Sequence, residues 1–261
     1  MSTVNDVMKA MEQIAPVSLK EDFDNVGLMV GDRNLEVKKV LFALDCTLAV
    51  IEEAKKEQAD MIITHHPLIF RKPSSITTDT LQGKKILELI QNQISLYSSH
   101  TNLDSVAGGI NERIGQMLGF EHSEILDRNH TDANAGIGRI MTPEKPIPVN
   151  DFIQKVKEVL GLTHMRAVIA GEEIHKLAII NGSGQDYIAK AVSLGADCVL
   201  TGDTTYHFAS DYKEMGITIL DAGHFSTEHL VFFDVMKKLE SQFSDVTFLF
   251  SSVEEDPYTF V

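Results

Sequence analysis

The sequence alternates short apolar runs with amphipathic stretches, and it does so twice in the same order. In the first half, strands are predicted at 40–44, 61–64 and 94–98, separated by helices at 48–56 and 84–91. In the second half, strands are predicted at 177–180, 198–201 and 218–220, separated by helices at 188–194 and 207–214. Strands that alternate with helices form right-handed βαβ units around a mainly parallel sheet. This order predicts an α/β protein made of two structurally related α/β domains.

Comparing the two halves residue by residue supports an internal duplication. An offset of 137 superposes the apolar runs without a gap and gives six identities across the 26 positions from 39 to 64. The identical residues are Lys39, Ile51, Ala54, Ala59, Asp60 and Thr64, which coincide with Lys176, Ile188, Ala191, Ala196, Asp197 and Thr201. The repeat and the polar stretch at 120–136 predict a first domain at 1–127 and a second at 128–261. The strand-like end, 246–261, is able to pack back on the first domain, and the sequence does not assign it to either half.

Composition and charge exclude several classes of protein. The 261 residues are 43% hydrophobic and 23% charged, as in a globular chain, and no apolar run approaches the roughly 18 residues of a membrane span. The first residues show no secretory pattern, and the two cysteines suggest no disulfide framework, so a cytoplasmic location is expected. The formal charge of −15 disfavours nucleic acid and anionic membranes as partners, but a small anionic substrate such as a nucleotide remains possible.

Metal-type ligands follow the predicted strands of both halves. Parallel α/β sheets bind ligands beyond the carboxyl ends of their strands. His65 and His66 come directly after the strand at 61–64, and as neighbours in an extended segment their side chains are expected to point apart. With an offset of 124, His100 and Asp104 coincide with His224 and Glu228, again just past a strand. These positions predict a two-metal site in the cleft between the domains, with His65, His66, Asp104, His224 and Glu228 as ligands.

Each of these residues also has an ordinary structural interpretation. His65 and His66 would be surface loop histidines, and Asp104 would stabilise a turn or a helix cap. Ser226 or Thr227 resembles the N-cap of a helix at 229–239, and Glu228 would then interact with its dipole. The metal site is the more economical explanation because imidazoles and carboxylates occur together at strand ends in both predicted halves.

The donor set indicates the metal and its charge. Imidazole and carboxylate ligands without cysteine suit two divalent ions of zinc, manganese, iron or nickel. Two such ions carry four positive charges, and Asp104 and Glu228 supply two negative ones. The remaining positive charge would bind a phosphate or activate a hydroxide despite the acidic surface.

Other polar segments carry weaker signals. The acids of 21–24 are interpreted as possible solvated surface, and His207 either serves the site or simply lies on a helix. The turn Asn181-Gly182-Ser183-Gly184 is able to approach a phosphate, although it lacks the lysine of a P-loop.

The motifs Glu21-Asp-Phe-Asp-Asn-Val-Gly27, Thr64-His-His-Pro67, Ser99-His-Thr-Asn-Leu-Asp104, Thr201-Gly-Asp203 with His207, and Gly223-His224 with Glu228 occur in order along essentially the whole chain. In this set the sequence resembles the NIF-three-like dinuclear-metal proteins, many of which are named GTP cyclohydrolase 1 type 2 homologues. Phe23 stands where that family usually has another aromatic residue, often tryptophan. The resemblance implies that the five predicted ligands bind two metals and that the chain forms a ring-shaped homohexamer.

The resemblance also implies an activity. A metal-bound hydroxide would attack C8 of GTP and open the guanine imidazole ring with release of formate, and His100 or His207 would transfer protons. Two alternatives stay open: a phosphoester hydrolase that uses the same metals, and a non-enzymatic metal-binding or regulatory ring.

Overall fold

The structure is a computed structural model that describes residues 1–260, and the chain divides into two compact units. The first unit comprises Met1–Val106 and Phe232–Glu255. The second comprises Ala107–Val231 together with residues 256–260. These limits differ from the predicted division at 127/128, because the chain enters the second unit earlier and returns to the first for part of its last helix and its last strand.

The first unit contains a five-stranded sheet in the order β1-β4-β3-β2-β13. Three parallel strands at its centre confirm the predicted α/β pattern, namely β2 (Lys39–Ala43), β3 (Met61–Thr64) and β4 (Ser95–Ser98). At one edge, β1 (Gly27–Val30) is antiparallel to β4, and at the other, β13 (Thr247–Phe250) is parallel to β2. The strand-like end of the chain therefore completes the sheet of the first unit.

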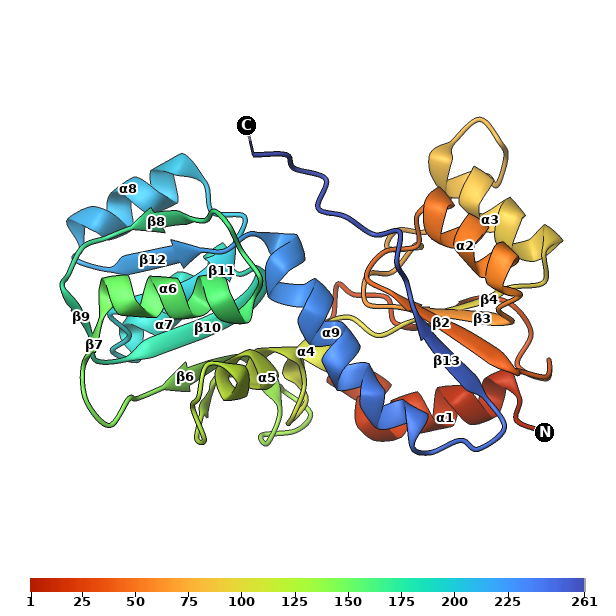
Figure 1. The fold of residues 1–261 in the computed structure, drawn as a ribbon, viewed down its shortest axis with the longest axis horizontal. Helices are drawn as coiled ribbons and strands as arrows, with labels where there is room; N and C mark the ends of the chain where they lie inside the picture. Colours follow the sequence, from red (N-terminus) through yellow and green to blue (C-terminus); the bar gives the residue numbers. More distant parts are fainter. Residues whose placement is uncertain (261) are drawn as a thin grey trace. The chain divides into compact units, whose positions relative to one another are not determined.

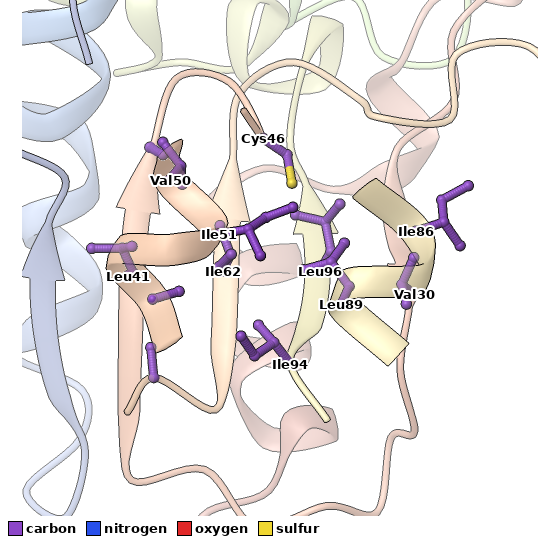
Figure 2. Close-up of a cluster of buried hydrophobic side chains, with 13 residues drawn as sticks. Val30, Leu41, Cys46, Val50, Ile51, Ile62, Ile86, Leu89, Ile94 and Leu96 are labelled. Carbon is purple, nitrogen blue, oxygen red and sulfur yellow. The ribbon is translucent and has the colours of Figure 1, made fainter. Parts of the chain in front are cut away.

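Helices α2 (Leu48–Glu57) and α3 (Leu81–Gln91) lie together beside this sheet, as Figure 1 shows. Each begins after a threonine whose hydroxyl accepts a hydrogen bond from an amide in the first turn, Thr47 from Val50 and Thr80 from Gly83. Their apolar faces and the inward side chains of the strands form one buried cluster (Figure 2). Cys46 belongs to this cluster, and its burial raises the pKa of its thiol to about 12.

Alternation along β2 sends neighbouring side chains to opposite faces of the sheet. Leu41 joins the cluster under α2 and α3, whereas the ring of Phe42 contacts Phe232 edge-on at 6.4 Å between centroids. Phe232 belongs to α9 (His224–Glu240), which begins in the second unit. Helix α1 (Val4–Ile14) also buries an apolar face, and Thr3 forms a capping box at its start. The remaining helical segments of this unit are η1 (Val17–Leu19) and α4 (Thr101–Ser105).

The second unit contains a six-stranded sheet in the order β5-β6-β10-β11-β12-β8. Its strands β10, β11 and β12 pair in parallel, and the pairings of β5 with β6, β6 with β10 and β12 with β8 are antiparallel. The strands are β5 (Glu124–Arg128), β6 (Gly136–Met141), β8 (Arg166–Val168), β10 (Leu177–Ser183), β11 (Cys198–Gly202) and β12 (Thr218–Asp221). A short antiparallel ladder joins β7 (Ile147–Pro148) to β9 (Glu173–Ile174).

Helices accompany both faces of this sheet. Helix α5 (Ile110–Met117) lies against β6 and β10, whereas side chains of α7 (Ile188–Ser193) and α8 (Tyr206–Glu214) join a cluster with alternate strand residues. The other helical segments are α6 (Val149–Val159) and η2 (Gln185–Tyr187). Within residues 1–260, no helix combines the length and the apolar character that crossing a membrane requires.

The central strands of the two sheets pair in equivalent registers. Val40 lies opposite Met61 in the first sheet, and Leu177 lies opposite Cys198 in the second. Both residues of the first pair become those of the second under the offset of 137 found in the sequence. The registers therefore agree with that offset, and the internal duplication itself stays a prediction.

Candidate metal-binding site

Three histidines come together in the first unit, at the carboxyl ends of β3 and β4. One ring nitrogen from each of His65, His66 and His100 lies within 4.8 Å of the others. The ring centroids of His65 and His66 are 5.0 Å apart, so these neighbours do not point apart as expected from an extended segment. The reason is that the chain bends at 65–66, just beyond the end of β3. His100 precedes the first turn of α4.

Each of these histidines is held through its Nδ1 atom. His65, fully buried, bonds the carbonyl oxygen of Ser99 at 2.9 Å, and because a carbonyl only accepts, Nδ1 must carry the proton. The Nδ1 atoms of His66 and His100 lie 3.0 and 2.9 Å from carboxylate oxygens of Asp45 and Asp24. A neutral imidazole protonated at Nδ1 has its lone pair on Nε2. These contacts therefore prepare three Nε2 atoms as metal ligands, in the manner of carboxylate–histidine–metal triads.

Asp24 is a buried carboxylate, 6% exposed, and the interpretation of its segment as solvated surface is wrong for this residue. Its Oδ1 contacts His100, and its Oδ2 accepts hydrogen bonds from the amide and the hydroxyl of Thr101. Burial by itself raises the pKa of Asp24, but the contacts with His100 and Thr101 outweigh it and hold that pKa at about 2. Asp24 is thus ionised at neutral pH and favours a proton on Nδ1 of His100.

Asp104 adds a carboxylate to this group. It lies on α4, 7% exposed, with Oδ1 3.6 Å from Nε2 of His65. Of the residues expected to bind metal, His65, His66 and Asp104 therefore lie together in the first unit, and His100 joins them.

In the second unit, His224 and Glu228 lie on consecutive turns of α9. The helix begins at His224 and not after Ser226 or Thr227, so the predicted N-cap is wrong. Thr227 lies inside the helix, where its hydroxyl donates to backbone carbonyls of the preceding turn. Residues four apart face the same side of a helix, and Nε2 of His224 is 3.1 Å from Oε2 of Glu228.

This second pair is also oriented by neighbours. Nδ1 of His224 lies 2.7 Å from Oδ2 of Asp203, and Asn181 donates a hydrogen bond of 2.8 Å from its amide nitrogen to Oε1 of Glu228. Glu228 is only 2% exposed. As in the first unit, a carboxylate at Nδ1 prepares Nε2 of the histidine for a metal.

The glycine-rich stretch at 181–184 makes room for this pair, and it is not the expected turn, because residues 181–183 belong to β10. Gly182 has φ +57°, and a Cβ atom there would lie 2.3 Å from Oε1 of Glu228 and 3.2 Å from Nε2 of His224. Its amide donates to the hydroxyl of Thr227. Close approach of backbone to the carboxylate therefore accounts for the glycine at this position.

Sequence reasoning missed Asp45 and did not assign an orienting role to Asp24, Asp203 or Asn181. Asp45 and Asp203 follow the ends of β2 and β11, so the strand-end rule that selected the histidines was also a signal for these aspartates. Asp203 has a positive φ of 55°, a conformation that aspartate tolerates better than most residues. His207 lies on α8, where its ring contacts that of Tyr206 edge-on with 5.4 Å between the ring centroids. Its catalytic role stays a prediction.

Both donor sets suit a transition-metal dication. They combine imidazole Nε2 atoms with the carboxylates of Asp104 and Glu228, and the two cysteines are buried elsewhere. Nitrogen and carboxylate oxygen donors of this kind are preferred by zinc, manganese, iron or nickel over calcium. The residues present therefore fit a metal in each unit.

The fold and these donor sets define an α/β protein with histidine–carboxylate sites at the ends of its strands. Residues 2–257 match the model of the Duf34/NIF3 (NGG1p interacting factor 3) family, and the chain belongs to that family. A Clostridium perfringens protein named GTP cyclohydrolase 1 type 2 homolog is 53% identical over 260 residues, covering 99% of each chain.

Solved structures have the same fold. A Bacillus cereus protein related to NIF3 superposes with a TM-score of 0.90 at 24% identity, covering 100% of this chain and 99% of that one. A hypothetical Staphylococcus aureus protein reaches a TM-score of 0.89 at 30% identity and covers 99% of both chains. The match to the family model confirms the predicted family, and these likenesses confirm the predicted α/β fold class.

Proposed function

We propose that this protein is a metal-dependent hydrolase that binds two divalent cations and opens the imidazole ring of GTP. The ligands of the cations would be His65, His66 and Asp104 in the first unit and His224 and Glu228 in the second. Bound dications supply Lewis acidity and lower the pKa of water. One observation carries the proposal. The Nδ1 atom of each of four histidines contacts an acceptor, which leaves Nε2 for a metal; these are His65, His66, His100 and His224.

His100 would act as the general base and general acid of the reaction. Because ionised Asp24 contacts its Nδ1, Nε2 of His100 accepts a proton from an attacking water, and the Asp24 carboxylate stabilises the imidazolium that forms. Ring opening consumes one water at C8 to leave a formamide, and a second water releases formate. His100 would return its proton to the departing nitrogen.

The test is elemental analysis of the purified protein and of the variants His65→Ala and Glu228→Ala, followed by GTP turnover with the metal found. We expect about two metals per chain in the wild type, fewer in both variants, and a loss of formate release of about a hundredfold or more. His175→Ala is the matched control, because Nδ1 of His175 also contacts an aspartate, Asp197, at an exposed position outside both donor sets.

The variant His100→Ala separates two roles for that residue. Retained metal with lost turnover supports proton transfer, whereas lost metal makes His100 a further ligand of the group that it forms with His65 and His66. A fully loaded wild-type protein without GTP turnover would contradict the proposed reaction and favour phosphoester hydrolysis or a metal-binding ring. Wild-type protein without metal would contradict the proposal as a whole.

A further inference from the structure

A cavity of about 580 Å³ lies in the second unit, and residues of the candidate metal site form part of its wall. His224 and Asp203 line it together with the adjoining start of α9. The C-terminal segment 256–260 forms another part of the wall, and residues 162–166 form a third. A ligand in this cavity would therefore contact both His224 and the end of the chain.

The C-terminal segment presents aromatic rings to the cavity. Tyr258 and Phe260 line it although they are 73% and 60% exposed, and Phe260 stacks on His164 with ring centroids 5.8 Å apart and planes inclined by 18°. The segment has a defined shape, because Oδ1 of Asp256 accepts a hydrogen bond of 2.8 Å from the amide of Tyr258. Exposed rings around a cavity favour a planar ligand that covers them.

A guanidinium group lies in the same wall. Arg166 is the only lysine or arginine among the described lining residues, and its side chain is 65% exposed. Nη2 of Arg166 bonds the buried carboxylate of Asp221 and the carbonyl oxygen of Thr204. Both bonds use Nη2 and fix the guanidinium, and a fixed guanidinium group suits the oxygens of a phosphate.

We infer that this cavity is a nucleotide-binding pocket in which Tyr258 and Phe260 stack on the base and Arg166 binds the phosphates. A nucleotide combines a planar base for the exposed rings with phosphates for the exposed guanidinium of Arg166. The inference rests on the proposed function in one respect, since it brings a nucleotide to His224. It extends that function by assigning substrate recognition to the C-terminal segment.

The test is calorimetric titration of metal-free protein with GTP, guanosine and inorganic triphosphate, so that binding is measured without turnover. Tyr258→Ala and Phe260→Ala are each expected to weaken GTP and guanosine binding about tenfold and to leave triphosphate binding unchanged. Tyr206→Ala, at a tyrosine that is 79% exposed but does not line the cavity, should bind like the wild type.

Arg166 is tested separately. Arg166→Ala should weaken GTP and triphosphate binding, while guanosine binding is retained. Arg166→Lys preserves the charge beside Asp221 and should lose only part of the affinity, which distinguishes phosphate recognition from misfolding. Arg113→Ala, at an arginine of α5 outside the cavity, is the matched control.

Unchanged guanosine affinity in both aromatic variants, or no GTP binding by the wild type, would overturn the inference. A different result would contradict the proposed hydrolase activity. In that case, metal-loaded protein would bind GTP in this pocket but would release no formate. Conversely, formate release with the same KM in the wild type and in Tyr258→Ala would refute the pocket and leave the hydrolase intact.

Discussion

At the scale of single residues, neighbouring carboxylates decide which nitrogen of a candidate histidine ligand carries the proton. Histidine alone does not specify which nitrogen carries the proton, and the acceptor at Nδ1 makes that choice. Asp24, Asp45 and Asp203 each supply such an acceptor. The cost of burying Asp24 is offset by the hydrogen bonds it accepts from its neighbours, which makes its charge both stabilising and pH-sensitive.

Replacing Asp24 with asparagine should therefore lower stability in a pH-dependent way. The folded pKa of about 2 lies below the ordinary value of 3.8, so ionised Asp24 stabilises the fold above pH 4, and this contribution disappears as the pH falls towards 2. At pH 7 we expect Asp24→Asn to lose about 2 kcal/mol of unfolding free energy. Urea denaturation of both proteins between pH 2 and 7 measures the difference, which should shrink below pH 4.

Asp32→Asn is the control for this experiment, because Asp32 lies in an exposed turn where its carboxylate bonds Asn34. It should change stability by no more than about 0.5 kcal/mol at any pH. If Asp24→Asn lost the same unfolding free energy at every pH, the charge of Asp24 would not be the cause of the loss, and the shape of the side chain would be.

At the scale of elements, a strand end and a helix start place the ligands of the second unit. The last residues of β10 pass so close to Glu228 that only glycine fits at 182, and α9 begins early enough to carry both His224 and Glu228 on one face. These two ligands are therefore positioned by one helix and by the end of β10.

Gly182→Ala is predicted to lower stability through backbone strain and, in addition, to disturb the metal site. An alanine at positive φ costs about 1 kcal/mol, and the added Cβ would also displace the Glu228 carboxylate. Gly216→Ala has the same backbone problem, with φ +79°, but its Cβ would meet nothing within 4 Å. We expect both variants to lose stability, and only Gly182→Ala to lose metal, as measured by elemental analysis after dialysis. Equal metal content in the two variants would contradict the role given to Gly182.

At the scale of the whole molecule, neither unit is one continuous stretch of the chain. The first unit requires residues from both ends of the chain, since β13 pairs with β2 and Phe232 packs on Phe42. The second unit is an insertion between these parts, followed by the segment 256–260.

A fragment of residues 1–127, the predicted first domain, should therefore not fold cooperatively. It leaves the edge of β2 unpaired and removes the part of α9 that packs on Phe42, including the buried side chains of Phe232 and Met236, which are worth roughly 1.5–3 kcal/mol each. A chain that joins 1–106 to 232–255 through a flexible Gly/Ser linker restores these contacts and should fold. Thermal unfolding followed by circular dichroism compares the two, and a cooperative transition in 1–127 would contradict the interleaved architecture.

The sequence by itself determined the succession of strands and helices, the family and the candidate ligands. Apolar periodicity is a local property, and strand ends can be located from it, which is why His65, His66, Asp104, His224 and Glu228 were found beside them. The register of β2 on β3 also agrees with the offset found between the halves.

Only the tertiary structure decided which partners those ligands have and where the end of the chain packs. Asp24 lies 76 residues before His100 and Asp203 lies 21 before His224, so no local pattern connects them. Strand β13 pairs with β2, and Phe42 of β2 packs against Phe232 of α9, the helix that precedes β13. Such choices depend on packing between distant segments, and only the folded chain brings those segments into contact.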